Sequence, residues 1–479
     1  MTITVYVPGD TTAASLGAEA VAHAVAAEAA RRGPPVRIVR NGSRGLFWLE
    51  PLVEVQVDTQ RIAYGPVQAA DIPGLFAAGF LEGGAHPLRQ GPVDAIPYLL
   101  NQQRLTCARL GAVDPLDLDD YRAHGGYAGL HLALPMTSSG IVQSVTDSGL
   151  RGRGGAAFPT GIKWRTVLDT SAPQKYIVCN ADEGDSGTFS DRLLMEGDPF
   201  CLIEGMTIAA LAVGATAGYI YLRCEYPRAK AVLEHAIATA RRAGYLGDDL
   251  LGSGRSFDLQ VRLGAGAYIC GEETSLLESL EGRRGEVRFK PPLPAIKGLF
   301  DRPTVINNVI TFASVPIIFE RGAAYYRDYG MGRSRGSLPI QLAGNVARGG
   351  LIERAFGVTL NELLYDYGGG TRSGRPIRAV QVGGPLGAYW PAAKFDTPLD
   401  YESFAQAGGM LGHGGIVVFD DSVDLAAQAR YAMEFCATES CGKCTPAASV
   451  PPAASKSSTG SWPATRVRKP CCAISATPW

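Results

Sequence analysis

Four short segments between residues 150 and 310 constrain the fold of this chain most strongly. Each combines glycine or another small residue with charged or amide side chains, and the segments begin at Gly152, Asn180, Gly264 and Pro303. Small residues let the backbone approach a ligand closely. Between the segments, apolar runs predict alternating strands and helices, such as a strand at 176–180 and a helix at 228–242. The sequence therefore predicts an α/β domain with ligands at the carboxyl ends of its strands.

The first segment, residues 152–161, has four glycines in ten residues. Backbone N–H groups in such a loop can converge on an anion, and Arg153 and Lys163 add positive charge. A phosphate-bearing ligand is the natural guest. The alternative is a plain glycine-rich surface loop. The match to a dinucleotide-binding G-x-G-x-x-G motif is weak, because no acidic ribose-binding residue follows in a clear β-α-β unit.

The other three segments each have a functional and a structural interpretation. The amide and carboxylate of Asn180 and Asp182 can bind a ring edge or sugar hydroxyls, or they belong to an acidic turn that caps a helix. Glu272 and Glu273 follow a run of small residues, and they can contact a ligand or serve as N-terminal helix charges. Asn307 and Asn308, at a strand-to-helix junction, can cap the helix or bind phosphate and ribityl groups.

The chain is long enough for about three domains. Its first 95 residues follow the order β-α-β-β-β-α, with strands at 3–7, 36–40, 53–57 and 61–64 and helices at 13–31 and 72–80, which is compatible with a thioredoxin-like fold. This part has no cysteine, so it holds neither a redox dithiol nor an iron–sulfur cluster. We expect domains at 1–95 (thioredoxin-like), 96–135 (connecting helices), 136–335 (ligand-binding α/β), 336–422 (small β-rich module), 423–446 (start of a helical domain) and 447–479 (low-complexity tail).

Charge and hydropathy exclude several functions. The formal net charge is −1, which gives no electrostatic case for nucleic acid. The N-terminus shows no targeting signal and no apolar run is long enough to cross a membrane, so we expect a cytoplasmic protein without direct membrane insertion. Five isolated cysteines are expected to be small buried residues: Cys107, Cys179, Cys201, Cys224 and Cys270. Five crowd the C-terminal part and favour metal binding: Cys436, Cys441, Cys444, Cys471 and Cys472.

Together and in this order, the segments resemble one protein family. They read G-R-G-G-A-A-F-P-T-G-I-K-W (152–164), N-A-D-E-G-D-S-G-T-F-S-D-R (180–192), G-A-G-A-Y-I-C-G-E-E-T-S-L (264–276), I-N-N-V (306–309) and E-S-C-G-K-C-T-P (439–446). This pattern is similar to the NADH-oxidising flavoprotein subunit of respiratory complex I and to the diaphorase subunits of NAD-linked hydrogenases and formate dehydrogenases. The resemblance covers about residues 100–446. It implies FMN, NAD and one [4Fe–4S] cluster, and it makes the module at 336–422 β-grasp-like.

The resemblance also implies roles for individual residues, with hydride transfer performed by FMN and no side chain acting as acid or base. Phe158 would stack on the dinucleotide, Asp185 would contact the nicotinamide amide, and Glu273 and Lys290 would lie near the adenosine. Thr166 and Leu293 stand where some relatives have aromatic residues. The FMN site would comprise Gly152, Arg153, Gly154, Gly155, Lys163, Asn180, Asp182, Tyr268, Gly271, Glu272, Asn307 and Asn308, with Glu183 also at the cofactor.

Three features resemble the formate dehydrogenase branch of the family. Asp185-Ser186 replaces the Glu-Pro typical of complex I and resembles both the hydrogenase and the formate dehydrogenase branches. The N-terminal domain lacks the cluster-binding cysteines that its hydrogenase version usually carries, and residues 104–127 look like formate dehydrogenase beta subunits. The implied partners are a molybdopterin/iron–sulfur catalytic subunit and a small [2Fe–2S] thioredoxin-like subunit. The alternatives are a hydrogenase diaphorase subunit, a complex I-like NADH dehydrogenase subunit, or a non-catalytic electron-relay or scaffold subunit that has lost its flavin.

The cysteine segment departs from the family pattern. In the family, C-x2-C-x2-C is followed by a fourth cysteine about 40 residues later, whereas here Cys441 and Cys444 are followed by Ala447. Two thiolates alone do not hold a [4Fe–4S] cluster. The composition shifts abruptly after Pro446, and a single inserted nucleotide can restore a third cysteine and two amphipathic helices. We therefore infer a frameshifted or truncated helical iron–sulfur domain; a genuine low-complexity tail is the alternative.

Overall fold

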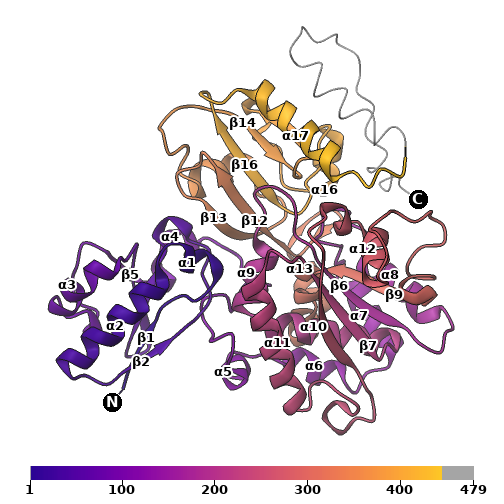
Figure 1. Ribbon diagram of the computed structural model, residues 1–479, viewed down its shortest axis with the longest axis horizontal. Helices are drawn as coiled ribbons and strands as arrows, with labels where there is room; N and C mark the ends of the chain where they lie inside the picture. The colour runs from indigo at the N-terminus through magenta and orange to yellow at the C-terminus, as the bar shows by residue number, and fades with distance from the viewer. Residues whose placement is uncertain (1, 445–479) are drawn as a thin grey trace.

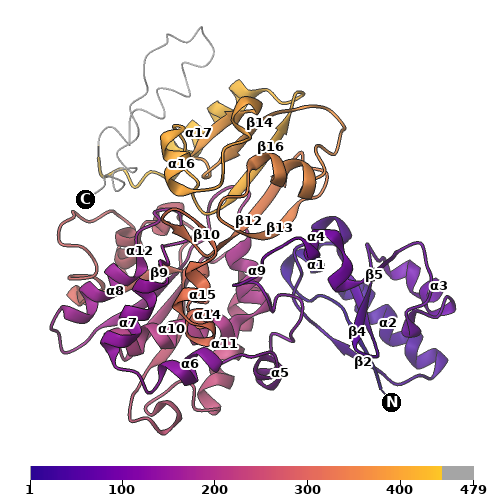
Figure 2. The same ribbon diagram turned by 180° about the vertical axis from the view of Figure 1, so that it is seen from behind.

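The structure is a computed structural model that describes residues 2–444. It has three main sheets, each with its own helices, as Figures 1 and 2 show from opposite sides. The chain is therefore an α/β protein with several sheets, as the sequence predicted. The boundaries of the predicted domains remain predictions, and the tail at 447–479, with Cys471 and Cys472, lies outside the described residues.

The N-terminal sheet has the order β2-β1-β3-β4-β5, in which β1 and β2 are parallel and the other pairs are antiparallel. The predicted helix at 13–31 is two helices, because Gly17 adopts the left-handed conformation with φ +100° and interrupts it. Strand β5 was not predicted. The elements are β1 (Ile3–Tyr6), α1 (Thr11–Ser15), α2 (Ala18–Arg32), β2 (Val36–Val39), β3 (Val53–Val57), β4 (Gln60–Tyr64), α3 (Ile72–Ala77) and β5 (Arg89–Pro92).

Short helices connect this unit to the central one: α4 (Pro97–Leu100), α5 (Leu118–Ala123) and α6 (Ala128–Ala133). The central sheet is fully parallel with the order β8-β7-β6-β9. Its elements are α7 (Ser138–Asp147), α8 (Thr160–Asp169), β6 (Tyr176–Ala181), α9 (Ser190–Gly197), α10 (Pro199–Val213), β7 (Ala217–Leu222), α11 (Pro227–Arg242), β8 (Asp258–Leu263), α12 (Glu273–Leu280), β9 (Thr304–Asn308), α13 (Val309–Ala313), α14 (Val315–Arg321) and α15 (Ala323–Arg327).

Helix α10 is the centre of the main hydrophobic core. All fifteen of its residues are buried, and they include Glu204, whose carboxylate accepts hydrogen bonds from Tyr121 Oη and from the Tyr127 and Leu130 N–H groups. A helix that is apolar all round is typical of a position between other elements. It packs against α6, α7, α8, α9, α11 and α13, and so fixes the sheet that carries the site.

The third sheet is mixed, with the order β13-β12-β16-β14-β15, and β12 and β16 are its parallel pair. Helix α17 follows it and leads to the described cysteines. The elements are β10 (Gly330–Met331), β11 (Ser334–Arg335), β12 (Ser337–Gly344), β13 (Gly350–Ala355), β14 (Ile377–Val382), β15 (Ala388–Pro391), α16 (Tyr401–Gln406), β16 (Gly415–Asp420) and α17 (Leu425–Glu439).

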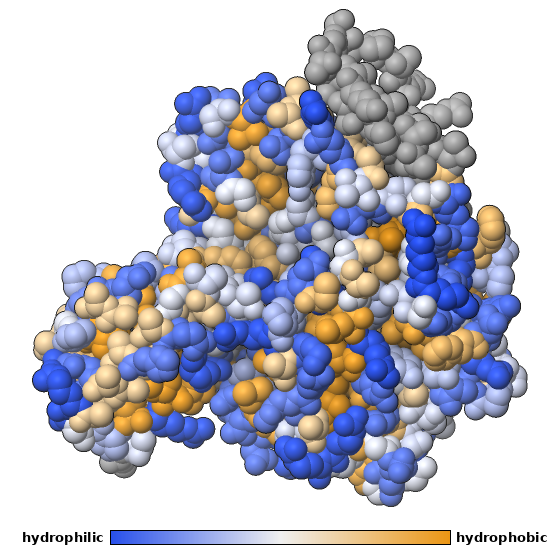
Figure 3. Space-filling view, viewed as in Figure 1, coloured by the Kyte–Doolittle hydropathy of each residue, from blue (hydrophilic) through white to orange (hydrophobic). Residues whose placement is uncertain are grey.

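The surface is mixed in hydropathy. On the face drawn in Figure 3, apolar residues lie in patches between hydrophilic ones. Within residues 2–444, no helix combines the length and the apolar character that crossing a bilayer requires.

Candidate functional site

Three of the four predicted segments follow strands of the parallel sheet, so they lie at one edge. Asn180 near the end of β6 is in register with Asn308 at the end of β9, and Cys179 is in register with Asn307. The third segment begins at Gly264, directly after β8. Parallel strands place their carboxyl ends on the same side, where α/β proteins bind ligands. Asn180 and Asn308 are therefore direct neighbours on adjacent strands, with Asn307 beside them.

The first segment lies against this edge as a loop before α8. Its ends are held by hydrogen bonds from Gly152 N–H to the Phe158 carbonyl (2.9 Å) and from Arg153 N–H to Thr311 Oγ1 (2.8 Å). A Cβ on Gly154 would lie 3.1 Å from the Cβ of Asn308, so a side chain at this position would crowd Asn308. Within residues 2–444, the N–H groups of Gly154 and Gly155 donate no hydrogen bond. They are available to an anion.

The side chain of Arg153 does not point into open space beside the loop. It is fully buried, and its guanidinium donates to Tyr326 Oη (2.8 Å) and to the carbonyl groups of Arg335 (2.5 Å) and Arg151 (3.1 Å). Arg153 Nε has no partner among the described residues. The structure thus shows Arg153 holding the loop to the region around β11, in addition to contributing charge.

Lysines and glutamates form a second group at the start of α12. Lys290 Nζ lies 2.8 Å from Glu272 and 2.9 Å from Glu273, and Lys163 Nζ lies 3.8 Å from Glu273. Burial would raise the pKa of Glu273, but the two lysines outweigh it and hold that pKa below its usual value. Glu272 caps α12 by accepting from the Thr274 and Ser275 N–H groups. The structural interpretation therefore holds for Glu272, while Glu273 is an ion-paired carboxylate.

The second and third segments are joined by side-chain hydrogen bonds. Asn180 Nδ2 donates to the Gly271 carbonyl (2.8 Å), and Tyr268 Oη donates to Asp185 Oδ1 (2.5 Å). Burial raises the pKa of Asp182 to about 7 and also raises the pKa of Asp185. Asp182 Oδ2 is buried without a partner among the described residues. A buried, unpartnered carboxylate oxygen is costly unless a ligand donates to it.

Asn307 and Asn308 make different hydrogen bonds. Asn307 Oδ1 accepts from the indole Nε1 of the buried Trp164 (3.0 Å). Asn308 is the N-cap of α13, where its side chain accepts from Thr311 N–H (3.0 Å). The predicted capping role is thus real for Asn308, and its amide nitrogen remains turned toward the loop side, near Asp191 (3.4 Å).

One buried group behind the glycine-rich loop was not predicted from the sequence. His413, from the turn before β16, lies with Nε2 at 3.3 Å from both Glu183 Oε1 and Asp191 Oδ1. All three side chains are buried. His413 stands in the sequence L-G-H-G-G, in which no helix or strand period indicates a contact with the central sheet. Only the spatial approach of the third sheet to the central one brings it there.

Exposed apolar side chains border the same region. Phe158 is 45% exposed, as a residue that stacks on a ligand requires, and Leu293 is 46% exposed. Phe289 is 87% exposed and stands beside Lys290; sequence reasoning missed it. Lys443 Nζ lies 5.4 Å from the centre of the Phe289 ring. The sequence carries no signal for this exposure, which depends on how the surrounding chain folds.

The C-terminal end of α17 lies against the third segment, and the residues after it lie close by. Phe435 packs on Tyr268 with ring centroids 4.8 Å apart, Glu439 Oε2 accepts from Tyr268 N–H (3.0 Å), and Arg284 donates to the Cys441 carbonyl (3.2 Å). Cys441 and Cys444 are therefore close to the site. They are two thiolates where a cubane needs four ligands, so the described residues do not fit a [4Fe–4S] cluster.

The isolated cysteines are mostly as expected. Cys107, Cys179, Cys201 and Cys270 are buried, but the prediction is wrong for Cys224, which is exposed. It follows the end of β7, where the chain leaves the sheet.

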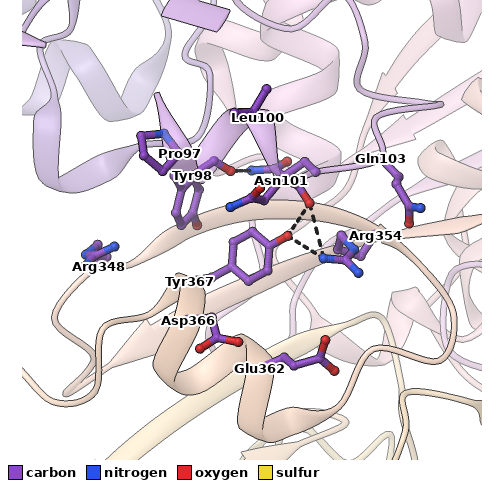
Figure 4. A pocket seen from close by; sticks show the side chains of 11 residues that line it. Pro97, Tyr98, Leu100, Asn101, Gln103, Arg348, Arg354, Glu362, Asp366 and Tyr367 are labelled. Carbon is purple, nitrogen blue, oxygen red and sulfur yellow. Dashed lines mark hydrogen bonds between the residues drawn. The ribbon is translucent and has the colours of Figure 1, made fainter. Parts of the chain in front are cut away.

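A separate hollow of about 440 Å³ lies between α4 and the third sheet, away from all four segments. Figure 4 shows Tyr367 and Arg354 turned toward Asn101, whose carbonyl accepts from both, and Arg354 also donates to Tyr367 Oη (2.6 Å). These contacts join the end of α4 to the third sheet and the helical turn before β14, so the hollow lies at an internal interface of the fold.

Comparisons with known proteins cover the part of the chain that holds the four segments. A family model described as the Nuo51 FMN-binding domain matches residues 145–317. The NADP-reducing hydrogenase subunit HndC of Solidesulfovibrio fructosivorans is 47% identical over 345 residues, which cover 72% of this chain and 70% of that protein. An NADH-quinone oxidoreductase subunit of Rhizobium meliloti is 49% identical over 330 residues, which cover 69% of this chain and 78% of that protein.

A solved structure of an NAD⁺-reducing [NiFe]-hydrogenase in the H2-reduced state aligns with a TM-score of 0.64 and 31% identity. The alignment covers 95% of this chain and 75% of that chain. Because it extends over nearly the whole chain, it includes the N-terminal unit that lies outside the stretch matched by the family model.

Proposed function

The chain belongs to the family of FMN-binding flavoprotein subunits of complex I and NAD(P)-reducing hydrogenases, and we propose that it is the subunit of a larger NAD-linked complex that exchanges electrons with NAD through FMN. Its activity is that of an NADH:acceptor oxidoreductase, or diaphorase. The observation that carries the proposal is the convergence of all four predicted segments on one edge of the parallel sheet.

The residues at this edge fit FMN. The N–H groups of Gly154 and Gly155 have no acceptor within residues 2–444 and are available to a phosphate. A side chain at Gly154 would crowd Asn308. Several buried polar atoms in the segments also have no partner among the described residues, as a site that expects a polar ligand requires. These atoms are Asp182 Oδ2, Ser186 Oγ, Ser275 Oγ and Thr160 Oγ1.

When bound, FMN supplies hydride exchange with NAD(H) and single-electron exchange with other carriers. The chain supplies binding and orientation. Asp185, held by Tyr268, is placed to accept from the nicotinamide amide, and Phe158 offers an exposed ring for stacking on the dinucleotide. Glu273, between Lys163 and Lys290, is placed on the adenosine side. These assignments extend the family resemblance to this geometry.

The complex that contains the chain is a finer proposal. The sequence favoured formate dehydrogenase, with a molybdopterin/iron–sulfur subunit and a small [2Fe–2S] subunit as partners. The relatives named above are hydrogenase and NADH-quinone oxidoreductase subunits, and they support the alternative better. We therefore propose first a hydrogenase-type or complex I-like assembly. A formate dehydrogenase remains the second proposal, and a gene for a molybdopterin subunit beside this one would support it.

Two modules complete the proposal. The N-terminal sheet has the order and helix placement of a thioredoxin-like unit without cysteines, and the mixed third sheet is the candidate β-grasp-like module. The helix α17 and the two cysteines are the start of a helical iron–sulfur domain. No electron step is assigned to a cluster, because the described residues do not supply its ligands.

Reconstitution with FMN tests the function directly. The purified chain should bind FMN, show absorbance near 450 nm in an oxidised flavin spectrum, and reduce ferricyanide with NADH. All segments that the activity requires precede residue 310. Bound FMN without diaphorase activity would refute the activity. Failure to bind FMN would favour the scaffold or relay subunit.

A further inference from the structure

Each ring nitrogen of His413 has a hydrogen-bond acceptor as a neighbour. Its Nδ1 lies 2.9 Å from the carbonyl oxygen of Arg153, which accepts and cannot donate. The Asn308 amide nitrogen also lies 3.5 Å from Nδ1, farther away than the Arg153 carbonyl. The Nε2 of His413 lies 3.3 Å from one oxygen each of Glu183 and Asp191. The Ser190 hydroxyl at 3.2 Å from Nε2 can turn either way. A ring that donates from both nitrogens is an imidazolium.

Other groups also hold Glu183 as an anion, and its pKa is lowered, whereas burial raises the pKa of Asp191 to about 6. Glu183 accepts from the Asp191 N–H (3.0 Å) and the Arg192 N–H (3.1 Å), and Tyr226 Oη donates to it at 3.1 Å. Asp191 lies 3.4 Å from the Asn308 amide nitrogen. Burial would lower the pKa of His413, but the two carboxylates outweigh it and raise this pKa well above its usual value.

Among the described residues, no other cation takes this place. Three arginines lie nearby, but the guanidinium of each donates to an acceptor other than the two carboxylates. Arg153 donates to Tyr326 and Arg335. Arg223 donates to the backbone carbonyl of Glu183, and Arg192 donates to Thr12. The third carboxylate in the vicinity, Asp185, is held by Tyr268. Without His413, two buried carboxylates would lie behind the glycine-rich loop with no facing cation, which is strongly unfavourable.

The contact with the Arg153 carbonyl also sets the direction of the loop. In a planar trans peptide, the C=O of Arg153 and the N–H of Gly154 point in opposite directions. When His413 holds that carbonyl, the Gly154 N–H is turned away from the carboxylates. This is the N–H that makes no hydrogen bond within the described residues.

We propose that His413 is a positioning residue that stays protonated, offsets the Glu183–Asp191 charge and aims the Gly154 N–H at an anionic phosphate. The inference rests on the proposed flavin site. It links the third sheet to cofactor binding, because His413 precedes β16 of that sheet and its ring holds the loop. Without the charged His413 ring, the uncompensated carboxylates repel the phosphate, and the peptide between Arg153 and Gly154 loses its fixed orientation.

Protonation of His413 can be measured without FMN. The chain has six histidines, so ¹⁵N-histidine labelling of the apo protein gives few imidazole signals, and His413→Gln identifies the one that disappears. We expect that signal to be doubly protonated at pH 8. A neutral imidazole at pH 8 would overturn the proposal, and so would a stoichiometric metal ion bound to the cluster, since the ring would then be a ligand.

Charge balance is tested by binding. FMN and riboflavin, which has no phosphate, are titrated into the apo forms of wild type, H413Q, D191N and H413Q/D191N, with the exposed His235→Gln on α11 as matched control. We expect H413Q to weaken FMN at least tenfold and riboflavin much less, H413Q/D191N to recover most of the FMN affinity, and H235Q to equal wild type.

Equal losses for FMN and riboflavin, or no recovery in the double variant, would overturn the proposed charge role. If wild type itself binds no FMN, the proposed function fails. The ¹⁵N measurement still decides the protonation state of His413 in that case.

Discussion

Tyr268 Oη donates a hydrogen bond of 2.5 Å to Asp185 Oδ1 and thereby joins the loop after β8 to the loop after β6. The backbone N–H of the same tyrosine donates to Glu439, and its ring packs on Phe435. One residue thus connects the proposed nicotinamide side of the site with the segment that carries the cysteines. Changes at either end should be separable by measuring NADH kinetics and flavin content independently.

Asp185→Ala should raise the KM for NADH about tenfold and leave the FMN content of the protein unchanged. Loss of one hydrogen bond to a charged acceptor is worth about 1.4 kcal/mol, which corresponds to this factor. Steady-state kinetics and flavin absorbance measure both quantities. Asp185→Asn, which keeps an acceptor oxygen for Tyr268, serves as the control and should have a smaller effect. Loss of FMN from the Ala variant would place Asp185 in the flavin site.

Phe158→Ala should raise the KM for NADH several-fold and leave stability almost unchanged. An aromatic stacking contact contributes about 1 kcal/mol, and a side chain that is 45% exposed contributes little to the core. Phe300→Ala is the matched control, because Phe300 is 52% exposed and precedes β9, so it lies toward the opposite edge of the sheet. Equal KM values for the two variants would argue against stacking by Phe158.

Asp182→Asn should remove part of the pH dependence of stability of the apo protein. Burial raises the pKa of this carboxyl from 3.8 to about 7, so the folded state binds the proton more tightly than the unfolded state. Stability then falls as pH rises from about 4 to 7, since the ionised form is the unfavourable one when buried. Denaturant midpoints at pH 5, 6, 7 and 8 should decline less in D182N than in wild type. Parallel curves would contradict the assignment.

Trp164→Phe should lower the free energy of unfolding by about 1–3 kcal/mol and weaken FMN binding. The substitution removes the hydrogen bond from Nε1 to Asn307 Oδ1 and leaves a buried acceptor without its donor. Urea unfolding and FMN titration measure the two effects. Trp390→Phe is the control, because Trp390 is also buried but packs on Phe404 of α16 and, within residues 2–444, its indole donates no hydrogen bond to the four segments. The Trp390→Phe variant should lose stability and keep the FMN affinity of wild type.

The chain as written should contain little iron and should not pass electrons to partner subunits, although it reduces dyes. Cys441 and Cys444 provide two of the four ligands that a [4Fe–4S] cluster requires, and Ala447 stands at the third position. Iron analysis and partner-coupled NAD⁺ reduction are the measurements. Restoring the reading frame after Pro446 should recover both. About four irons per chain in the protein as written would contradict the frameshift and the ligand assignment together.

Some features of the fold followed from local sequence. The strand at 176–180 and the cap at Asn308 were predicted because burial periodicity and side-chain capping act within a few residues. Gly17, which divides the first helix, and β5 were missed. A glycine in a helical run stays in the helix unless its neighbours favour the left-handed conformation, and a short edge strand has too few residues to show a period.

The sequence by itself showed four segments with glycines, carboxylates and asparagines, because these are local patterns, and their order resembled a flavin- and dinucleotide-binding family. Only the tertiary structure decided that Arg153 is buried against Tyr326 and that His413 meets Glu183, 230 positions away in the chain. Such contacts depend on how separate sheets pack. That packing is the sum of many weak apolar contacts distributed over the whole chain, and no single segment specifies it.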